Sequence, residues 1–85
     1  MAVVGASAVP GRIGHAIMKN ILEYGFPGRV YPVNPKYEEV MGLRCYRSVE
    51  ELPEPVDMAV IAIPARAVPG VVDVLGEKGC RVAVV

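Results

Sequence analysis

Three glycines near the start of the chain have the spacing of a loop that binds an anion. Gly5 follows a short apolar run, and Gly11 and Gly14 come just before a segment with helical periodicity. A strand, a glycine-rich turn and a helix in this order bring backbone N–H groups and the positive end of a helix dipole close to a phosphate. Ser7 adds a hydroxyl to this turn, which also contains Pro10. We therefore expect a phosphate-bearing ligand; the alternative is that the glycines only turn a tight strand-to-helix loop.

The spacing of the glycines narrows the choice of ligand. The dinucleotide-binding fingerprint is G-x-G-x-x-G, but a longer loop separates Gly5 from Gly11 and Gly14 in this chain. A loop that binds nucleoside triphosphates needs glycine and lysine followed by serine or threonine, and here Gly11 is followed by Arg12 and Ile13. The loop therefore matches neither the standard NAD fingerprint nor a triphosphate-hydrolysing loop. Arg12 offers it a further cation.

The end of the second predicted strand also bears on the ligand. In NAD-binding units an acidic residue about 20 residues beyond the glycines binds the ribose hydroxyls. Here the strand of residues 29–33 is followed by Asn34, Pro35 and Lys36, with no acid at that place. A lysine there suits a phosphate on the adenosine ribose, so NADP or coenzyme A fits better than NAD. The alternative is that Lys36 is an ordinary solvated lysine.

Apolar runs and helical periodicity predict the elements that hold these loops. Strands are expected at residues 2–5, 30–33, 43–46, 57–63 and 81–85, helices at 13–24 and about 67–78, and one helical turn at 49–52. This alternation is typical of a Rossmann-like α/β fold, a doubly wound, mostly parallel sheet of about five strands in the order 3-2-1-4-5. The strand at 43–46 is expected at the sheet edge, and the continuously apolar strand at 57–63 in the centre with both faces covered. The carboxyl ends of the first, second and fourth strands then gather the glycine loop, residues 34–36 and residues 63–65 around one crevice.

Composition and charge exclude several classes of protein. With 85 residues, 53% of them hydrophobic and 21% charged, the chain fits a single domain over residues 1–85. A formal net charge of zero gives no long-range attraction to nucleic acid or to an anionic membrane, so neither is expected as a partner. No apolar run is long enough to span a membrane, and no basic-then-apolar leader precedes the first strand, which favours a cytoplasmic protein. Cys45, Cys80 and the single histidine, His15, are too few for a structural zinc site or a Cys/His nucleophile.

Taken together, these motifs resemble the coenzyme A-binding domain of NDP-forming acyl-CoA synthetases, a family that includes ADP-forming acetate–CoA ligase and is similar to the alpha subunit of succinyl-CoA synthetase. The motifs that carry the resemblance span nearly the whole chain and are Gly5-Ala6-Ser7, Pro10-Gly11, Gly14, Tyr31-Pro32-Val33-Asn34-Pro35-Lys36, Pro53-Glu54-Pro55-Val56-Asp57 and Ile63-Pro64-Ala65. The resemblance implies that Lys36 meets the adenosine end of coenzyme A and that the pantetheine arm runs along residues 63–65. The cofactor-binding residues that it implies are Gly5, Ser7, Pro10, Gly11, Arg12, Gly14, Asn34, Lys36, Ile63, Pro64 and Ala65.

The resemblance also implies that catalysis takes place outside this chain. Such synthetases join a carboxylic acid to coenzyme A through an acyl phosphate and a phosphorylated histidine of a later domain. His15 opens a predicted helix and is not that histidine, so no catalytic residue is assigned. We expect a fragment of a larger ligase, with downstream ligase domains and an ATP-grasp domain or subunit as partners. The alternatives are a regulatory domain fused to a protein acetyltransferase, a stand-alone coenzyme A-binding protein and a nicotinamide-dependent oxidoreductase domain.

Overall fold

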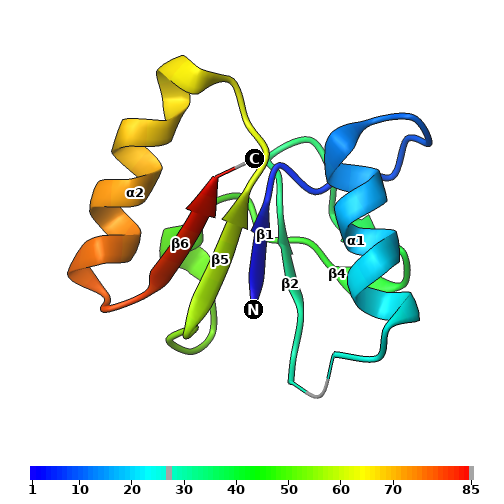
Figure 1. Cartoon of the computed structure of the whole chain (residues 1–85), viewed down its shortest axis with the longest axis horizontal. Helices are drawn as coiled ribbons and strands as arrows, with labels where there is room; N and C mark the ends of the chain where they lie inside the picture. Colours follow the sequence, from blue (N-terminus) through cyan, green and yellow to red (C-terminus); the bar gives the residue numbers. More distant parts are fainter. Residues whose placement is uncertain (27, 85) are drawn as a thin grey trace.

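Four parallel strands form a sheet through the middle of the molecule (Figure 1), as seen in a computed structural model that describes residues 1–26 and 28–84. The strands are β1 (Ala2–Val4), β2 (Tyr31–Val33), β5 (Met58–Ile61) and β6 (Arg81–Val84). Across the sheet their order is β2-β1-β5-β6. Helix α1 (Ile13–Glu23) connects β1 to β2, and α2 (Val68–Glu77) connects β5 to β6. The Rossmann-like α/β class predicted from the sequence is confirmed.

The two helices cover opposite faces of this sheet because side chains alternate between its faces along each strand. On one face Val4 of β1 and Ile61 of β5 pack in a core with Leu75 of α2. On the other face Val3 of β1 packs with Met18 of α1. All five side chains are buried, so each helix is attached to the strands through its own apolar stripe.

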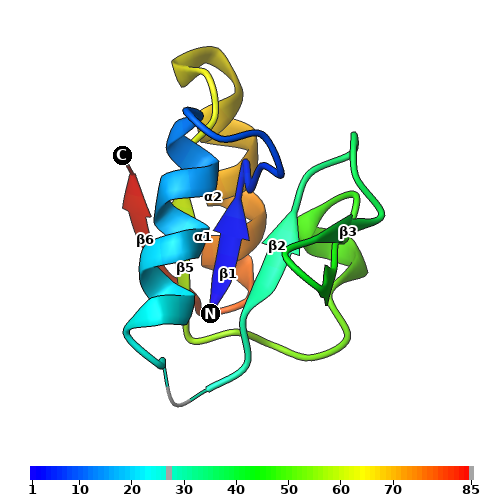
Figure 2. The ribbon, with the colours of Figure 1, turned by 90° about the vertical axis from the view of Figure 1, so that its right-hand side faces the viewer.

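The pairing of the predicted third strand is the main difference between the structure and the prediction. Leu43 and Arg44 do not join the sheet as an edge strand; instead they form β4 (Leu43–Arg44), which pairs antiparallel with β3 (Glu39–Val40) in a hairpin beside β2 (Figure 2). The φ angles of 51° at Met41 and 81° at Gly42 fold the chain back within two residues. Tyr46 does pair with Val33 of β2, through one parallel bridge at the edge where the strand was predicted. Within the described residues the main sheet therefore has four strands instead of about five, and these four follow the predicted order.

The remaining elements lie close to their predicted places. One 3-10 turn, η1 (Val49–Glu51), lies at the predicted helical turn, and a second, η2 (Ala65–Ala67), leads into α2. The expectation that the strand at 57–63 is covered on both faces holds for one face only. Ala59 and Ile61 are fully buried in the core that contains Leu75, whereas on the other face Met58 is 39% exposed and Val60 is half-buried. Residue 85, the predicted end of the last strand, lies outside the described residues. No helix in the described part of the chain is long and apolar enough to cross a membrane.

Candidate functional site

The carboxyl ends of β1, β2 and β5 bring three loops that are distant in sequence to one edge of the sheet (Figure 1). The N–H of Gly5 donates a hydrogen bond to the carbonyl oxygen of Val33 (2.8 Å), and the N–H of Ala62 donates one to the carbonyl oxygen of Val4 (2.8 Å). These two bonds join the end of β1 to the ends of both neighbouring strands. The glycine loop, the segment after β2 and the segment after β5 therefore begin side by side.

Two of the three loop glycines are required by close packing inside the protein. A Cβ on Gly14 would lie 1.9 Å from the carbonyl oxygen of Gly5, and a Cβ on Gly5 would lie 2.3 Å from the carbonyl oxygen of Ala62. Gly5 also has a φ of +90°, which residues with a side chain rarely adopt. The two glycines allow α1 to begin directly against the end of β1, so they position the loop.

Gly11 differs from both because it faces open space. Its φ is +91°, and a Cβ built on it would meet no atom within 4 Å. Its neighbours Pro10 and Arg12 are also exposed. Arg12 is the N-cap residue of α1, and its side chain makes no capping hydrogen bond. Since the first N–H groups of a helix have no partner within it, this loop presents backbone donors, a helix N-terminus and an arginine at the same place.

Ser7 and Asn34, two of the predicted site residues, have their polar atoms bonded within the protein. Ser7 is buried, and its Oγ accepts a hydrogen bond from the N–H of Val9 (3.1 Å) and lies 3.4 Å from the hydroxyl of Tyr37. The side-chain amide of Asn34 donates a hydrogen bond to the carbonyl oxygen of Ala6 (2.9 Å). These contacts tie the glycine loop to the segment after β2, so they favour a role for both residues in shaping the site.

Lys36 extends from this support into solvent. Its backbone N–H donates a hydrogen bond to Oδ1 of Asn34 (2.9 Å). Its side chain is exposed and, within residues 1–26 and 28–84, has neither an ion-pair nor a hydrogen-bond partner. The ammonium group is therefore available to an anion that reaches this edge of the sheet.

A cavity of about 390 Å³ opens at the same edge, on the side covered by α2. Three predicted site residues line it, Gly5, Asn34 and Ile63. Most of its remaining wall is apolar and includes Val4, Val33, Val49, Val71 and Val74. Pro64 and Ala65 do not line this cavity; they are exposed in the turn where η2 begins.

Sequence reasoning missed Glu50 and two further polar residues of this cavity, Arg47 and Ser48. Both follow directly after the strand predicted at residues 43–46. Their place beyond the carboxyl end of a predicted strand was the available signal, because the functional residues of such sheets gather at those ends.

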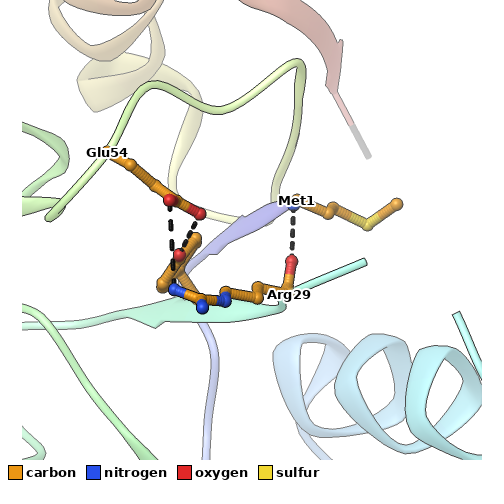
Figure 3. Close-up of polar contacts among 4 residues, drawn as sticks. Met1, Arg29 and Glu54 are labelled. Atoms are coloured by element: carbon orange, nitrogen blue, oxygen red, sulfur yellow. Dashed lines mark hydrogen bonds and ion pairs between the residues drawn. The ribbon is translucent and has the colours of Figure 1, made fainter. Parts of the chain in front are cut away.

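A separate polar cluster lies at the opposite, amino-terminal edge of the sheet (Figure 3). The amino terminus of Met1 donates a hydrogen bond to the carbonyl oxygen of Arg29 (2.7 Å). The hydroxyl of Tyr31 donates one to the carboxylate of Glu54, which also lies 3.9 Å from the guanidinium of Arg29. The bond to Glu54 raises the pKa of Tyr31. Because β1 and β2 separate this cluster from the glycine loop, it belongs to the support of the sheet and not to the candidate site.

Comparison with known proteins yields one family and several longer relatives. A family model described as a CoA binding domain matches residues 1–85. The alpha subunit of acetate–CoA ligase (ADP-forming) I of Pyrococcus furiosus is 52% identical over 96% of this chain and 19% of its own length. The solved dinucleotide forming acetyl-coenzyme A synthetase 1 of Ca. Korarchaeum cryptofilum is 49% identical with a TM-score of 0.85, over 93% of this chain and 18% of that one.

A third relative is much shorter than these enzymes. A solved conserved hypothetical protein from Pyrococcus furiosus is 35% identical with a TM-score of 0.74, and the match covers 98% of this chain and 90% of that one. The chain thus spans less than one fifth of the P. furiosus ligase subunit but nearly the whole of this shorter protein. Since the family model matches every residue, the chain belongs to the CoA binding domain family.

Proposed function

We propose that this domain binds coenzyme A across the carboxyl edge of its sheet. The observation that supports this most strongly is the pair of hydrogen bonds made by Gly5 and Ala62, since they join three loops whose chemistry suits the parts of one elongated ligand. The pyrophosphate meets the backbone donors around Gly11 and the guanidinium of the neighbouring arginine. The phosphate on the ribose meets Lys36, and the pantetheine arm follows residues 63–65.

The cavity supports the same ligand. Its volume of about 390 Å³ lies in the range of small-molecule sites. The side chains of Val33, Val71 and Val74 offer an apolar wall for the flat adenine ring. NAD fits less well, because Asn34 follows β2 where an NAD site carries an acid, and because NAD has no ribose phosphate for Lys36.

We infer further that the domain is the coenzyme A-binding part of an ADP-forming acid–CoA ligase. That enzyme interconverts acyl-CoA, ADP and phosphate with a carboxylic acid, coenzyme A and ATP. The inference is supported by the relatives named as ADP-forming acetate–CoA ligases, which are five or more times longer than this chain. The histidine that carries the phosphoryl group and the ATP-grasp domain or subunit belong to the rest of such an enzyme. The cytoplasmic location stays a prediction that goes with this function.

Calorimetric titration of the chain with coenzyme A, dephospho-coenzyme A and NAD tests the ligand. Coenzyme A should bind most tightly. A charge-assisted hydrogen bond contributes about 1.5 to 3 kcal/mol, which is roughly a 10-fold to 100-fold change in affinity. Because Lys36 is exposed, Lys36→Ala should weaken coenzyme A binding by about 10-fold, the low end of that range, and should change dephospho-coenzyme A binding much less.

Lys78→Ala is the matched control, because Lys78 is also exposed but follows α2 at the amino-terminal edge of the sheet. It should leave all three affinities unchanged. Tighter binding of NAD than of coenzyme A would overturn the proposed ligand. An equal loss of affinity for coenzyme A and dephospho-coenzyme A in Lys36→Ala would show that Lys36 does not bind the ribose phosphate.

A stand-alone coenzyme A-binding protein is the second candidate function. It is favoured by the solved P. furiosus protein, which this chain matches over 90% of its length. Both candidates bind coenzyme A, so the length of the encoded polypeptide separates them. A polypeptide several times longer than this chain, with acid-dependent formation of ADP from ATP, supports the ligase, and a polypeptide of about this length supports the stand-alone protein.

A further inference from the structure

Arg47 lies beside the candidate site although no motif marks it. The N–H of Tyr46 donates a hydrogen bond to the carbonyl oxygen of Pro32 (2.9 Å), and the carbonyl oxygen of Tyr46 accepts one from the N–H of Asn34 (2.9 Å). This pair of bonds attaches the start of the segment 46–48 to the carboxyl end of β2. Arg47 is therefore held next to Asn34 by the backbone, and its position does not depend on a flexible loop.

Hydrogen bonds link Asn34 both to Lys36 and to the residue before Arg47. The backbone N–H of Lys36 bonds the side chain of Asn34, while the residue directly before Arg47 bonds its backbone. Lys36 is thus hydrogen-bonded to Asn34 directly, and Arg47 is the residue that follows Tyr46, which is hydrogen-bonded to Asn34. Two positive groups are brought to one strand end although eleven positions separate Lys36 from Arg47 in the sequence.

Arg47 lies where an apolar cavity and a polar hollow meet, and charges of both signs line these spaces. Arg47 lines the mostly apolar cavity and also an adjoining polar hollow of about 630 Å³, which Tyr37 and Arg44 line as well. Three carboxylates also line these spaces, Glu50 the cavity and Glu38 and Glu51 the hollow. Oε2 of Glu51 accepts a hydrogen bond from the backbone N–H of Arg47 (3.1 Å).

The cations at this place are not all equally available. The guanidinium of Arg44 lies over the ring of Tyr46, 5.3 Å from its centroid. The guanidinium of Arg47 is exposed and, within the described part of the chain, makes no ion pair. Of the two arginines, Arg47 is the one whose side chain remains open at the boundary between the apolar cavity and the polar hollow.

We propose that Arg47 and Lys36 together bind the ribose 3′-phosphate of coenzyme A, with the adenine ring in the apolar cavity. This inference rests on the proposed coenzyme A binding and deepens it. A phosphate monoester carries close to two negative charges at neutral pH, so one lysine leaves part of that charge unpaired. A guanidinium can donate two parallel hydrogen bonds to phosphate oxygens, which an ammonium cannot do in the same geometry. Arg47 therefore makes the domain selective for coenzyme A over its dephosphorylated form.

Calorimetry on Arg47→Gln and Arg47→Lys tests this assignment. Arg47→Gln should bind coenzyme A about 10-fold more weakly and dephospho-coenzyme A within about twofold of the original chain. Arg47→Lys keeps the charge but loses the paired donors, so its affinity for coenzyme A should lie between the two. In the double variant with Lys36→Ala the losses should not add, because both side chains bind the same phosphate.

Arg81→Gln is the matched control, since Arg81 is exposed at the start of β6, on the amino-terminal edge, and should leave both affinities unchanged. Unchanged coenzyme A affinity in Arg47→Gln overturns the role of Arg47, while tight coenzyme A binding by the original chain still supports the proposed function. An equal loss of affinity for coenzyme A and dephospho-coenzyme A also overturns it, because Arg47 then does not bind the 3′-phosphate. If the original chain binds coenzyme A no better than NAD, the proposed function fails together with this inference.

Discussion

Replacing Gly14 with alanine tests whether helix α1 is packed against the glycine loop as closely as the structure indicates. The added Cβ would lie 1.9 Å from the carbonyl oxygen of Gly5, where Cβ contacts under 3.0 Å are essentially never seen, so the start of α1 has to move by about 1 Å. Overpacking of this kind costs about 1 to 3 kcal/mol, and the upper end applies because a backbone carbonyl cannot rotate away. Alanine regains up to about 1 kcal/mol through its helix propensity. We expect the free energy of unfolding to fall by about 2 kcal/mol.

Gly76→Ala in α2 provides the matched control. Gly76 is also helical, but a Cβ on it would meet no atom within 4 Å, so the substitution should raise the free energy of unfolding by about 0.5 to 1 kcal/mol. Urea denaturation followed by far-UV circular dichroism measures both values. If Gly14→Ala alone does not fold, it can be measured in the Gly76→Ala background, because the two sites lie on opposite faces of the sheet and should be additive. Equal stability of the two single variants would refute the close contact between α1 and the end of β1.

Three further predictions concern the loop, the amino-terminal edge and a thiol. Gly11→Val should weaken coenzyme A binding by about 10-fold with an unchanged circular dichroism spectrum, because a side chain at this positive φ displaces the backbone donors. Gly25→Val is the control, because Gly25 also has a positive φ and open space around it but follows the far end of α1, and it should not alter the affinity. Equal affinities of the two variants would count against a ligand role for the loop. Tyr31→Phe should lower the urea midpoint and leave coenzyme A affinity unchanged in calorimetry, since the lost hydrogen bond to Glu54 lies at the opposite edge, and a loss of affinity would contradict this separation. Burial raises the pKa of the Cys45 thiol, so its labelling by an aromatic disulfide, located by mass spectrometry, should be slow in the folded chain at pH 7. The rate should keep increasing as the pH is raised past the ordinary pKa of a cysteine thiol, and fast labelling at pH 7 would show that the thiol is open to solvent.

Local patterns predicted most of the fold. The apolar periodicity that starts at Ile13 predicted α1 at residues 13–24, and the helix covers Ile13–Glu23. Right-handed crossovers then determine the order of the four main strands, because each helix can return to the sheet in only one way. The segment at 43–46 was predicted only in part, because so short a segment is compatible with either partner strand. Tyr46 pairs with β2 as expected, whereas Leu43 and Arg44 pair with β3. The positive φ angles of the preceding turn commit these two residues to a hairpin.

The candidate site was predicted only in part. The sequence marks Gly5, Gly11 and Gly14 as one motif, but it cannot assign them different roles. Those roles depend on which carbonyl oxygens approach each Cα, and such distances arise only when the strands and α1 are packed together. Arg47 was not predicted for the same reason. It is distant from Asn34 in the sequence, and only the backbone hydrogen bonds of Tyr46 bring the two residues together.

The sequence by itself determined the class of fold, the glycine spacing from which an anion-binding first loop is predicted, and the absence of an acid after β2. These properties depend on residue type and on spacings of a few positions, so they can be predicted without a structure. Only the tertiary structure decided that Gly11 faces solvent while Gly5 and Gly14 are packed, that Ser7 and Asn34 are bonded within the protein, and that Arg47 joins Lys36 at one strand end. The physical reason is that parallel strands bring residues together through hydrogen bonds between distant segments, and no local pattern encodes which side chains then remain unpaired.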